Sequence, residues 1–523
     1  MSRRFDVVVI GSGFGGAISA GRLAESGRSV CVLERGRRWN PVDFPRSPTQ
    51  IAGTGFWDGR SGLIDYRAFS TMHVIQASGV GGGSLVYFNV HARPPASIFE
   101  DPRWPAALDL ERLDPYYRRV AEMLDVRPLE PPAGRALPAR TSAFLDACRA
   151  TGREAQLLPI AVHTGPPRDD QGLLQLPCDY SGNCAIGCAG GAKNTLDRNY
   201  LPLAERHAAE IRPGCQAEAI IPRGSGYRVA YRSAAGPDHV EAPCVIVSAG
   251  TLGTAELLLR CRDVTRTLPR LGPALGTGFS GNGDVLLAGA LTDLDIDPGR
   301  GPSITAGVDV ATPRQEAFVE DLGFPEPLVW FVEGMLANAR PTANLIRWAK
   351  LFVEGGLRIA GATERIGRER AQLLGGGRTR GVLPYLGMCE DAADGRFVLD
   401  RSGRLDLRWD AQASLTNLHE LEAVMRELSE AIGGEYLRSP FWDGLGQLLT
   451  AHPLGGCPMG DDGVVDDLGA VHEYPGLFVI DGSIVPTALA RNPSATIGAL
   501  AERSAFHQIH GRDVTAAELV AHA

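Results

Sequence analysis

The sequence predicts an α/β protein whose first domain is a Rossmann-like dinucleotide-binding unit. An apolar run at Phe5–Ile10 leads into the glycine loop GSGFGG, and a helical stretch follows it. A second apolar run then ends at an acidic residue, Glu34. Two later segments, His239–Arg260 and Gly476–Pro486, contain further strand-like runs. Because these segments lie far apart along the chain, we expect a discontinuous domain.

Size and composition are those of a globular protein of at least two domains. The chain has 523 residues, of which 44% are hydrophobic and 22% charged. A formal net charge of −9 without a Lys/Arg block argues against a nucleic-acid partner. No apolar stretch reaches the roughly 18 residues needed to cross a membrane. The first strand leaves no room for a signal peptide, so we expect a cytoplasmic protein with reduced thiols.

The first glycine loop has the pattern GxGxxG, and each glycine has a physical role. Gly11 permits the tight turn, Gly13 lets the backbone approach a pyrophosphate, and Gly16 allows close packing of helix on strand. The free N–H groups of the helix N-terminus attract phosphate. The loop residues Gly11, Gly13, Phe14, Gly15 and Gly16 are therefore candidate cofactor-binding residues.

Glu34 lies about 20 residues after the first glycine, where a ribose-binding acid is expected. A carboxylate there suits a ribose 2′-hydroxyl, and both FAD and NAD carry one. This site by itself leaves the two cofactors open. The later match GTGFSG, at 276–281, has no preceding strand run and is discounted.

A second glycine loop, SGVGGGSLVYFNV, spans Ser78–Val90. It is either a tight turn before a strand or a backbone surface that lies against a flat or anionic cofactor. Its candidate cofactor-binding residues are Gly79, Gly83 and Ser84.

Near the C-terminus, a buried strand-like run ends in Asp481-Gly482, and a helix is expected to begin at Asn492. Asn492 is a good N-cap residue, and Pro493 suits the first helical position. The positive end of this helix would face whatever lies before it.

Together these segments resemble the glucose–methanol–choline (GMC) oxidoreductase family, and in particular its cholesterol-oxidase branch. The resemblance rests on six segments in family order: DVVVIGSGFGGAISAGRLAESG, GVGGGSLV, VIVSAGTLGTAELLLR, GNGDV, HPLGGC and LFVIDGSIVPTALARNPSATIGALAER. It implies FAD as the cofactor, an alcohol as the substrate, and hydride transfer to flavin N5.

The resemblance also implies roles for individual residues. Gly11, Gly13, Gly16 and Glu34 would hold the ADP part of FAD, and Gly83 and Ser84 would lie along the flavin. Asp481 and Gly482 would lie beside the isoalloxazine and the ribityl chain. His452 matches the active-site histidine of the family, and Asn492 matches its partner asparagine.

The chain departs from the cholesterol oxidases at two places. Tyr87, Phe88 and Asn89 follow GGGSLV where that branch carries an asparagine and glycines, and Ser494 stands where it carries an aromatic residue. Both positions lie close to the expected flavin, so the sequence does not specify a sterol.

His452 is one of only 11 histidines and begins the segment HPLGGC. Pro453 restricts its backbone, and Gly455 and Gly456 are expected to let the loop lie close to the cofactor. Oxidation of an alcohol requires groups that hold the hydroxyl and remove its proton. Histidine and asparagine can both donate and accept hydrogen bonds, and histidine can act as a base.

Glu320 lies in the segment FVED, within the part of the chain that matches the family poorly. By resemblance it corresponds to the carboxylate with which cholesterol oxidases isomerise a double bond, and it is the third candidate catalytic residue. The alternative is a solvated acidic loop, since Glu316 and Glu326 lie close by in the sequence.

Cys178, Cys184 and Cys188 lie within eleven residues of one another. Zinc sites and cubane clusters usually need four ligands, and the only candidate for a fourth is the more distant Cys215. We expect a glycine-rich turn with free thiols and no metal.

The segment Thr342–Leu374 has helical periodicity with apolar and Arg-rich faces. It is either a helical insertion of the substrate domain or a lid that makes peripheral contact with a membrane surface.

These observations predict a Rossmann-like FAD-binding domain of GMC type, built from residues 1–95, 175–300 and 440–523. An α+β substrate domain, 300–440, is expected over an antiparallel sheet, and 96–174 is expected to cover the cofactor. The expected reaction is oxidation of a secondary alcohol on an apolar, polycyclic or terpenoid molecule, with O2 or another compound as electron acceptor. A dehydrogenase using a non-oxygen acceptor and a redox-neutral isomerase or cyclase are the alternatives.

Overall fold

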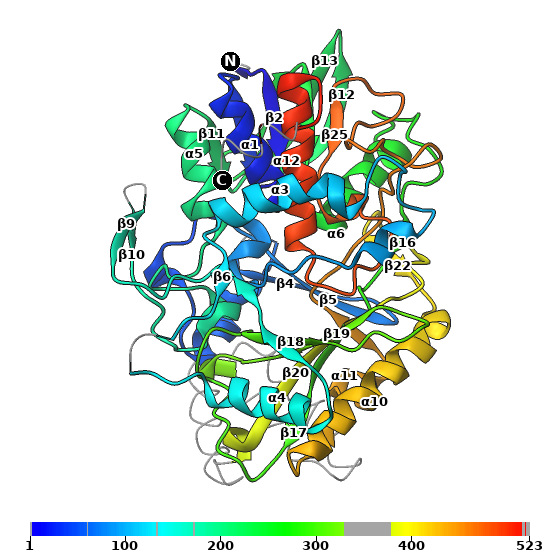
Figure 1. Ribbon diagram of the computed structural model, residues 1–523. Helices are drawn as coiled ribbons and strands as arrows, with labels where there is room; N and C mark the ends of the chain where they lie inside the picture. Colours follow the sequence, from blue (N-terminus) through cyan, green and yellow to red (C-terminus); the bar gives the residue numbers. More distant parts are fainter. Residues whose placement is uncertain are drawn as a thin grey trace.

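The computed structural model describes residues 3–59, 61–131, 134–170, 173–328, 378–514 and 518. Figure 1 shows two stacked parts. The upper part carries helices α1 and α12 beside a parallel sheet, and the lower part carries an antiparallel sheet with α4 and α10. The segment Thr342–Leu374, for which a helical insertion or a lid is expected, lies outside the described residues.

The upper part is built on a five-stranded parallel sheet of order β11-β3-β2-β15-β25. Its strands are β2 (Val7–Ile10), β3 (Val30–Glu34), β11 (Glu210–Pro213), β15 (Cys244–Val247) and β25 (Leu477–Val479). The strands β2 and β3 are buried along their whole length, as expected for apolar runs covered on both faces. The five strands come from three distant parts of the chain.

Helices cover this sheet. α1 (Phe14–Glu25) contacts both α5 (Tyr200–Arg206) and α12 (Ser494–His510), and α3 (Leu110–Met123) packs against α12. α6 (Gly250–Leu259) follows β15 directly. α1 ends where Gly27 adopts a left-handed conformation, with φ 90°, as the sequence predicts.

A smaller four-stranded sheet flanks the parallel one, in the order β1-β14-β13-β12. Its strands are β1 (Arg3–Arg4), β12 (Gln216–Arg223), β13 (Gly226–Ser233) and β14 (Gly236–Ala242).

The lower part is a six-stranded antiparallel sheet of order β23-β17-β20-β19-β18-β7. Its strands are β7 (Ala155–Leu157), β17 (Val285–Leu291), β18 (Ala306–Asp309), β19 (Ala317–Asp321), β20 (Val382–Cys389) and β23 (Glu435–Leu437). Helices α4 (Ala139–Ala150) and α10 (Leu415–Ala431) pack on it. The antiparallel sheet implied by the family resemblance is therefore present.

The strand pairings cross the expected domain boundaries in two places. β17 lies in the expected FAD segment 175–300, and β7 lies in the expected covering segment 96–174, yet both belong to the antiparallel sheet. The covering segment is also divided between the two parts, because α3 packs on α12 whereas α4 packs on the antiparallel sheet.

The chain also forms two small three-stranded sheets. One consists of β4 (Ile64–Ala68), β5 (Met72–Ala77) and β24 (Leu448–Thr450), and the other of β16 (Thr277–Phe279), β21 (Gly395–Leu399) and β22 (Leu405–Arg408). The remaining short α-helices and strands are α2 (Pro48–Gln50), α11 (Pro440–Leu445), β6 (Arg127–Pro128), β8 (Pro159–Ile160), β9 (Arg168–Asp170) and β10 (Leu173–Gln175). Among the described helices, none combines the length and the apolar character needed to cross a bilayer.

Candidate active site

The glycines of the first loop serve two different purposes. An added Cβ would lie 2.2 Å from Ser248 O at Gly11, 1.6 Å from Ile480 O at Gly15, and 2.1 Å from Gly11 O at Gly16. These three glycines are required because neighbouring backbone is too close for any side chain. At Gly13, by contrast, no atom lies within 4 Å of an added Cβ. Gly13 therefore faces open space, as a residue that approaches a pyrophosphate must.

Phe14 begins α1 and turns its ring toward the second glycine loop. The rings of Phe14 and Tyr87 meet edge to face, with centroids 5.5 Å apart. The two loops are also in direct backbone contact, because an added Cβ at Gly82 would lie 2.5 Å from Gly13 Cα. Phe14 therefore helps to join the two candidate cofactor loops.

Glu34 closes the end of β3, and its carboxylate accepts three hydrogen bonds. They come from the backbone N–H of Ser12 at 3.1 Å, the hydroxyl of Ser12 at 2.6 Å and the backbone N–H of Gly36 at 2.8 Å. Burial raises the pKa of Glu34, although these hydrogen bonds oppose the rise. The acid is thus held beside the first glycine loop, where the sequence places a ribose-binding residue.

The candidates of the second loop also divide into open and packed positions. An added Cβ at Gly79, where φ is 151°, would lie 2.7 Å from the Trp39 ring. The Ser84 hydroxyl donates to Gly81 O at 2.7 Å and accepts from Leu196 N–H at 3.0 Å. Only Gly83 faces open space, with no atom within 4 Å of an added Cβ.

Asp481 holds the turn after β25 against the start of α6. Its carboxylate accepts from Gly250 N–H at 3.0 Å, Thr254 hydroxyl at 2.5 Å, and Ser483 N–H and hydroxyl at 2.9 and 2.5 Å. Burial raises its pKa against these four hydrogen bonds. An added Cβ at Gly482 would lie 2.9 Å from the Thr251 hydroxyl oxygen. The side chain of Asp481 is therefore engaged within the protein.

His452 follows β24, and the carboxylate of Asp284 holds its ring. Nδ1 of His452 lies 3.0 Å from Asp284 Oδ1. The other oxygen, Asp284 Oδ2, accepts from the Thr450 hydroxyl and from Ala451 N–H, both at 3.0 Å. Because Nδ1 faces a carboxylate, it carries the proton, and Nε2 of the neutral ring is an acceptor. Within the described residues, Nε2 has no hydrogen-bond partner and so remains available to a substrate.

The two glycines after His452 lie in close contact with a small β-sheet. An added Cβ at Gly455 would lie 1.8 Å from Gly278 O in β16, and at Gly456 it would lie 3.1 Å from the Phe397 ring in β21. These two glycines allow the loop to pack on the small β16-β21-β22 sheet.

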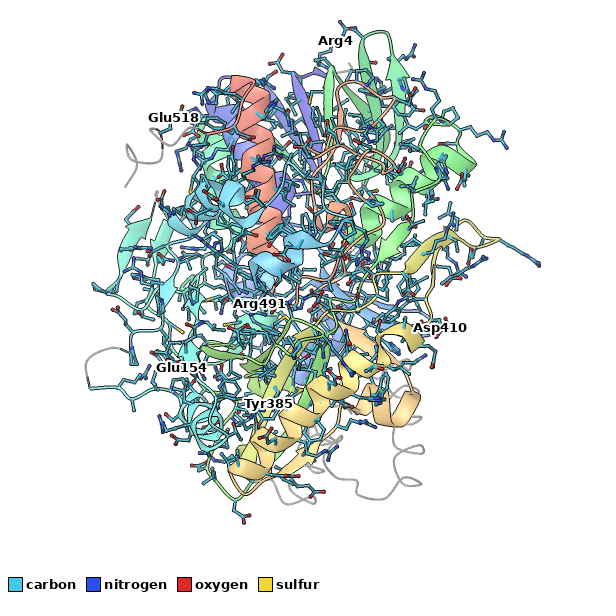
Figure 2. All side chains as sticks on the ribbon, turned by 45° about the vertical axis from the view of Figure 1, so that its right-hand side comes forward. Arg4, Glu154, Tyr385, Asp410, Arg491 and Glu518 are labelled. Atoms are coloured by element: carbon cyan, nitrogen blue, oxygen red, sulfur yellow. The ribbon has the colours of Figure 1, made fainter. Side chains whose placement is uncertain are left out.

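Asp284 is a site residue that the sequence reasoning missed, although it lies in the GNGDV segment. Asn282, in the same segment, donates to Arg491 O at 2.9 Å and accepts from Leu489 N–H at 2.8 Å. The GNGD turn therefore fixes both the His452 loop and the loop that precedes Asn492. Figure 2 places Arg491 where the upper and lower parts meet. The clustering of an amide and a carboxylate in this short turn was the available signal.

Asn492 does not cap its helix, contrary to the expectation from the sequence. α12 begins at Ser494 after Pro493, and its first backbone hydrogen bond runs from Ile497 N–H to Pro493 O at 2.9 Å. The Asn492 amide instead donates to Glu320 Oε2 at 3.2 Å. The physical reason is that Asn282 holds the preceding backbone, which turns the amide toward β19.

Glu320 lies in β19 and is completely buried, so the alternative of a solvated acidic loop is wrong. Neither Glu320 Oε1 nor Asn492 Oδ1 has a hydrogen-bond partner among the described residues. Burial raises the pKa of Glu320 well above its usual value, and the nearby charges of Asp321 and Asp284 raise it further. Glu320–Asn492 and Asp284–His452 are therefore neighbouring pairs, and each leaves a polar atom free.

The three clustered cysteines carry free thiols. Cys184 Sγ accepts from the Asn89 amide at 3.3 Å, and Cys188 Sγ accepts from Lys193 N–H at 3.5 Å. In the described ranges, no group of three or more His, Cys, Asp or Glu side chains is arranged to hold a metal ion.

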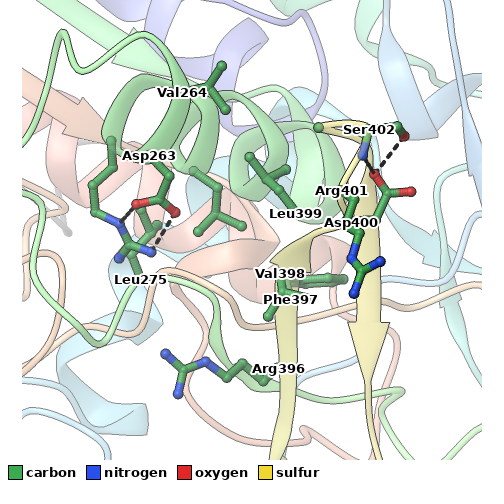
Figure 3. Close-up of a pocket in the computed structure, with 13 residues that line it drawn as sticks. Asp263, Val264, Leu275, Arg396, Phe397, Val398, Leu399, Asp400, Arg401 and Ser402 are labelled. Carbon is green, nitrogen blue, oxygen red and sulfur yellow. Dashed lines mark hydrogen bonds and ion pairs between the residues drawn. The ribbon is translucent and has the colours of Figure 1, made fainter.

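One pocket of the structure is separate from this site. It has a volume of about 520 Å³ and lies between the end of α6 and the β21–β22 hairpin (Figure 3). None of the candidate cofactor-binding or catalytic residues lines it. The arginines Arg396 and Arg401 do not point toward one another in Figure 3. The unpartnered oxygens of Glu320 and Asn492 lie outside this pocket.

The chain is similar to known proteins over most of its length. Two family models described as GMC oxidoreductase match residues 25–262 and 405–501, and one described as FAD binding domain matches 6–41. A cholesterol oxidase of Mycobacterium tuberculosis is 29% identical, over 97% of this chain and 91% of that protein. A long-chain-alcohol oxidase of Arabidopsis thaliana is 25% identical, over 94% of this chain and 66% of that protein.

Solved structures show the same fold. Pyridoxine 4-oxidase from Mesorbium loti superposes with a TM-score of 0.63 at 17% identity, covering 97% of this chain and 99% of that one. A fungal aryl-alcohol oxidase superposes with a TM-score of 0.62 at 18% identity, covering 98% of this chain and 100% of that one.

Proposed function

Because the chain belongs to the GMC oxidoreductase family and is an FAD-dependent enzyme acting on CH–OH groups, we propose that it oxidises a secondary alcohol on an apolar molecule. In this proposal, His452 and Asn492 hold the hydroxyl group. The relatives named cholesterol oxidase and long-chain-alcohol oxidase support an apolar alcohol as the substrate class. We propose a polycyclic or terpenoid skeleton.

The observation that carries the proposal is the pair of free polar atoms at the buried site. Asp284 holds the protonated Nδ1 of His452, which directs the acceptor Nε2 away from that carboxylate. Nε2 can therefore accept the hydroxyl proton as a general base. Asn492 has one N–H engaged by Glu320, which leaves its second N–H for the substrate oxygen. One acceptor and one donor are what a hydroxyl group needs in order to be oriented.

The chain fits FAD at the two loops that carry open glycines. Gly13 and Gly83 have no neighbouring atom where a side chain would stand, whereas Gly11, Gly15 and Gly16 pack on backbone and Gly79 packs on the Trp39 ring. Gly11, Gly13, Phe14, Gly15, Gly16 and Glu34 would hold the ADP part, and Gly79, Gly83, Ser84, Asp481, Gly482 and Asn492 would surround the flavin part. Bound FAD supplies the acceptor for the hydride that leaves the carbinol carbon.

Glu320 is a proton carrier in this proposal, because its acid is buried beside Asn492 with a free oxygen. A neutral carboxyl group in this position can deliver or receive a proton at a substrate carbon or oxygen. It would support a redox-neutral isomerisation as an alternative reaction, or as a step that follows oxidation.

We propose that the FAD-binding domain consists of 1–95, 175–284 and 440–523. This moves its central boundary to the start of β17. The substrate domain then includes β17, β7 and the remainder of the antiparallel sheet. The proposed active site lies where the two domains meet, because Glu320 comes from the antiparallel sheet, whereas His452, Asn492 and Asp284, which directly precedes β17, come from the FAD-binding domain.

A spectroscopic assay tests the proposal. Purified protein should show a flavin spectrum that bleaches anaerobically when apolar secondary alcohols are added. The panel should contain sterols, terpenoid alcohols and long-chain primary alcohols. Peroxide formation in air, compared with dye reduction, distinguishes O2 from another acceptor. Colourless protein that cannot be reconstituted with FAD, or a flavin that no alcohol bleaches, would refute the proposal. Turnover without a change in substrate mass would favour the isomerase alternative.

A further inference from the structure

Lys193 is a buried lysine that joins the second glycine loop to the cysteine segment. The residue is 1% exposed. Its ammonium donates to three backbone carbonyls, those of Leu85 at 2.8 Å, Tyr87 at 3.2 Å and Cys184 at 2.8 Å. An ammonium group has three N–H donors, so all of them are used.

The ammonium carries its charge without a bonded carboxylate. Among the described residues, each of its hydrogen bonds ends on a carbonyl, and it forms no ion pair. Burying a charge in this way costs free energy, which a neutral side chain of similar length would avoid. The structure therefore retains a charged donor here at a cost, which indicates a specific use.

Composition supports the same conclusion. The chain contains only two lysines, Lys193 and Lys350, among 52 basic residues, and all the others are arginine. A planar guanidinium cannot direct three donors tetrahedrally from one atom, whereas an ammonium can. Lys193 therefore stands where the geometry of three converging carbonyls requires the compact group.

The residues after Lys193 hold the same loop. Asn194 O accepts from the Tyr87 hydroxyl at 2.7 Å, and Leu196 N–H donates to the Ser84 hydroxyl at 3.0 Å. On the other side of the loop, the Tyr87 ring meets Phe14 of the first glycine loop. The 84–89 loop is thus fixed between the dinucleotide loop and the 193–196 segment.

We infer that Lys193 is a positioning residue for FAD, whose three N–H donors hold the 84–89 loop in the conformation that retains the cofactor. The inference rests on the proposed placement of the flavin along Gly83 and Ser84. It goes beyond that placement, because it assigns a role to a residue that would not itself touch the substrate.

The charge state of Lys193 gives the inference a distinctive signature. Burial lowers its pKa to about 8, and the charged or titratable groups that face it are Tyr87, Cys184, Cys188, Asp197 and Arg46. A neutral amine has only two N–H donors, so deprotonation releases one of the three carbonyls. Since FAD binding would favour the protonated form, FAD affinity should fall as the pH rises through 8, and bound FAD should raise the pKa of Lys193.

Two lysines make the titration directly observable. Protein with 13Cε-labelled lysine should give two signals, which Lys193→Met and Lys350→Met assign. The Lys193 signal should titrate near pH 8 in the FAD-free protein and at a higher pH in the holoprotein. FAD dissociation constants at pH 6.5 and 9.5 provide the matching binding measurement.

The expected results separate this role from a purely structural one. Lys193→Met should weaken FAD binding at least about 10-fold at pH 6.5, and its affinity should not change with pH. Wild-type affinity should approach that of the variant at pH 9.5. Equal FAD affinity of variant and wild type, or an equal loss at both pH values, would overturn the inference. A pKa of Lys193 that is equal in the FAD-free protein and in the holoprotein would also overturn the inference. If wild-type protein binds no FAD at all, the proposed function fails instead.

Discussion

Nδ1 of His452 lies 3.0 Å from Oδ1 of Asp284, and the side chain of that aspartate is completely buried. The imidazole itself is 12% exposed. The buried carboxylate holds Nδ1 and thereby fixes the orientation of the ring. The second ring nitrogen, Nε2, is then an oriented hydrogen-bond acceptor, which is the arrangement a general base needs. This relationship leads to the first two predictions.

His452→Ala should lower kcat by at least about 100-fold, because the general base would be lost. FAD should remain bound, since no cofactor-loop residue is hydrogen-bonded to this side chain. Stopped-flow reduction of the flavin and the absorbance ratio of flavin to protein measure both effects. His472→Gln is the matched control, because His472 bonds Gly460 O outside the site. An unchanged kcat in His452→Ala would exclude the assignment.

Asp284→Asn should lower kcat by about 10- to 100-fold, because the amide no longer fixes the protonated Nδ1. KM should change less than kcat, since we do not expect the aspartate to contact the substrate. Steady-state kinetics over a range of alcohol concentrations provide the measurement. Asp462→Asn, at an exposed position, is the control. A variant that raises only KM would contradict the positioning role.

Asn492→Ala should reduce kcat by about 10-fold or more, because the substrate oxygen loses a donor. The variant should also raise the pKa of Glu320 further, since the Asn492 hydrogen bond lowers that pKa. Kinetics and the pH dependence of Tm measure the two effects. If kcat and the pH dependence of Tm both matched wild type, the proposed contacts of Asn492 with the substrate oxygen and with Glu320 would contribute neither to catalysis nor to the pKa of Glu320.

Glu320→Gln should flatten the pH dependence of stability. The pKa of Glu320 is raised in the folded state, so the folded protein binds the proton more tightly than the unfolded chain. Its stabilising contribution is present below the unfolded pKa of about 4.5 and is lost as the pH rises through the folded pKa. Proton binding that is tenfold tighter in the folded state corresponds to about 1.4 kcal/mol of stability. The difference in Tm between the variant and wild type should therefore shift in favour of the variant as the pH rises from 5 to 8.

The control for this measurement is Glu326→Gln, which changes an exposed residue nearby. If the Tm of wild type rose more steeply with pH over this range than the Tm of Glu320→Gln, the expected sign of the Glu320 contribution to stability would be wrong. Loss of isomerised product in Glu320→Gln, with alcohol oxidation retained, would assign the second reaction to this acid.

The local elements of the cofactor fold were predictable because their signals are short-range. The strand, glycine loop, helix, strand and acid of residues 5–34 lie in one uninterrupted segment, and steric and dipolar requirements act within it. The antiparallel sheet was predicted through the family resemblance. Its membership was not, because β7 and β17 join it by pairing with strands far away in the sequence.

The side-chain partners within the site were less predictable. Asn492 has strong helix-capping chemistry, yet a carboxyl group 172 positions away accepts a hydrogen bond from its amide. Glu320 has the local composition of an exposed acidic loop, yet it lies in a central strand. In both cases a long-range contact overrides the local preference, because burial makes an unpaired polar group more costly than a missing cap.

By itself, the sequence determined the cofactor-binding scaffold, the GMC character of the chain, and His452 and Asn492 as candidate catalytic residues. Each of these is encoded in contiguous motifs. Only the tertiary structure decided that Asp284 orients His452, that Glu320 is buried beside Asn492, and that Lys193 holds the second loop. Those relationships depend on which distant strands and turns pack together, and hydrogen bonding in a buried interior is a property of that packing.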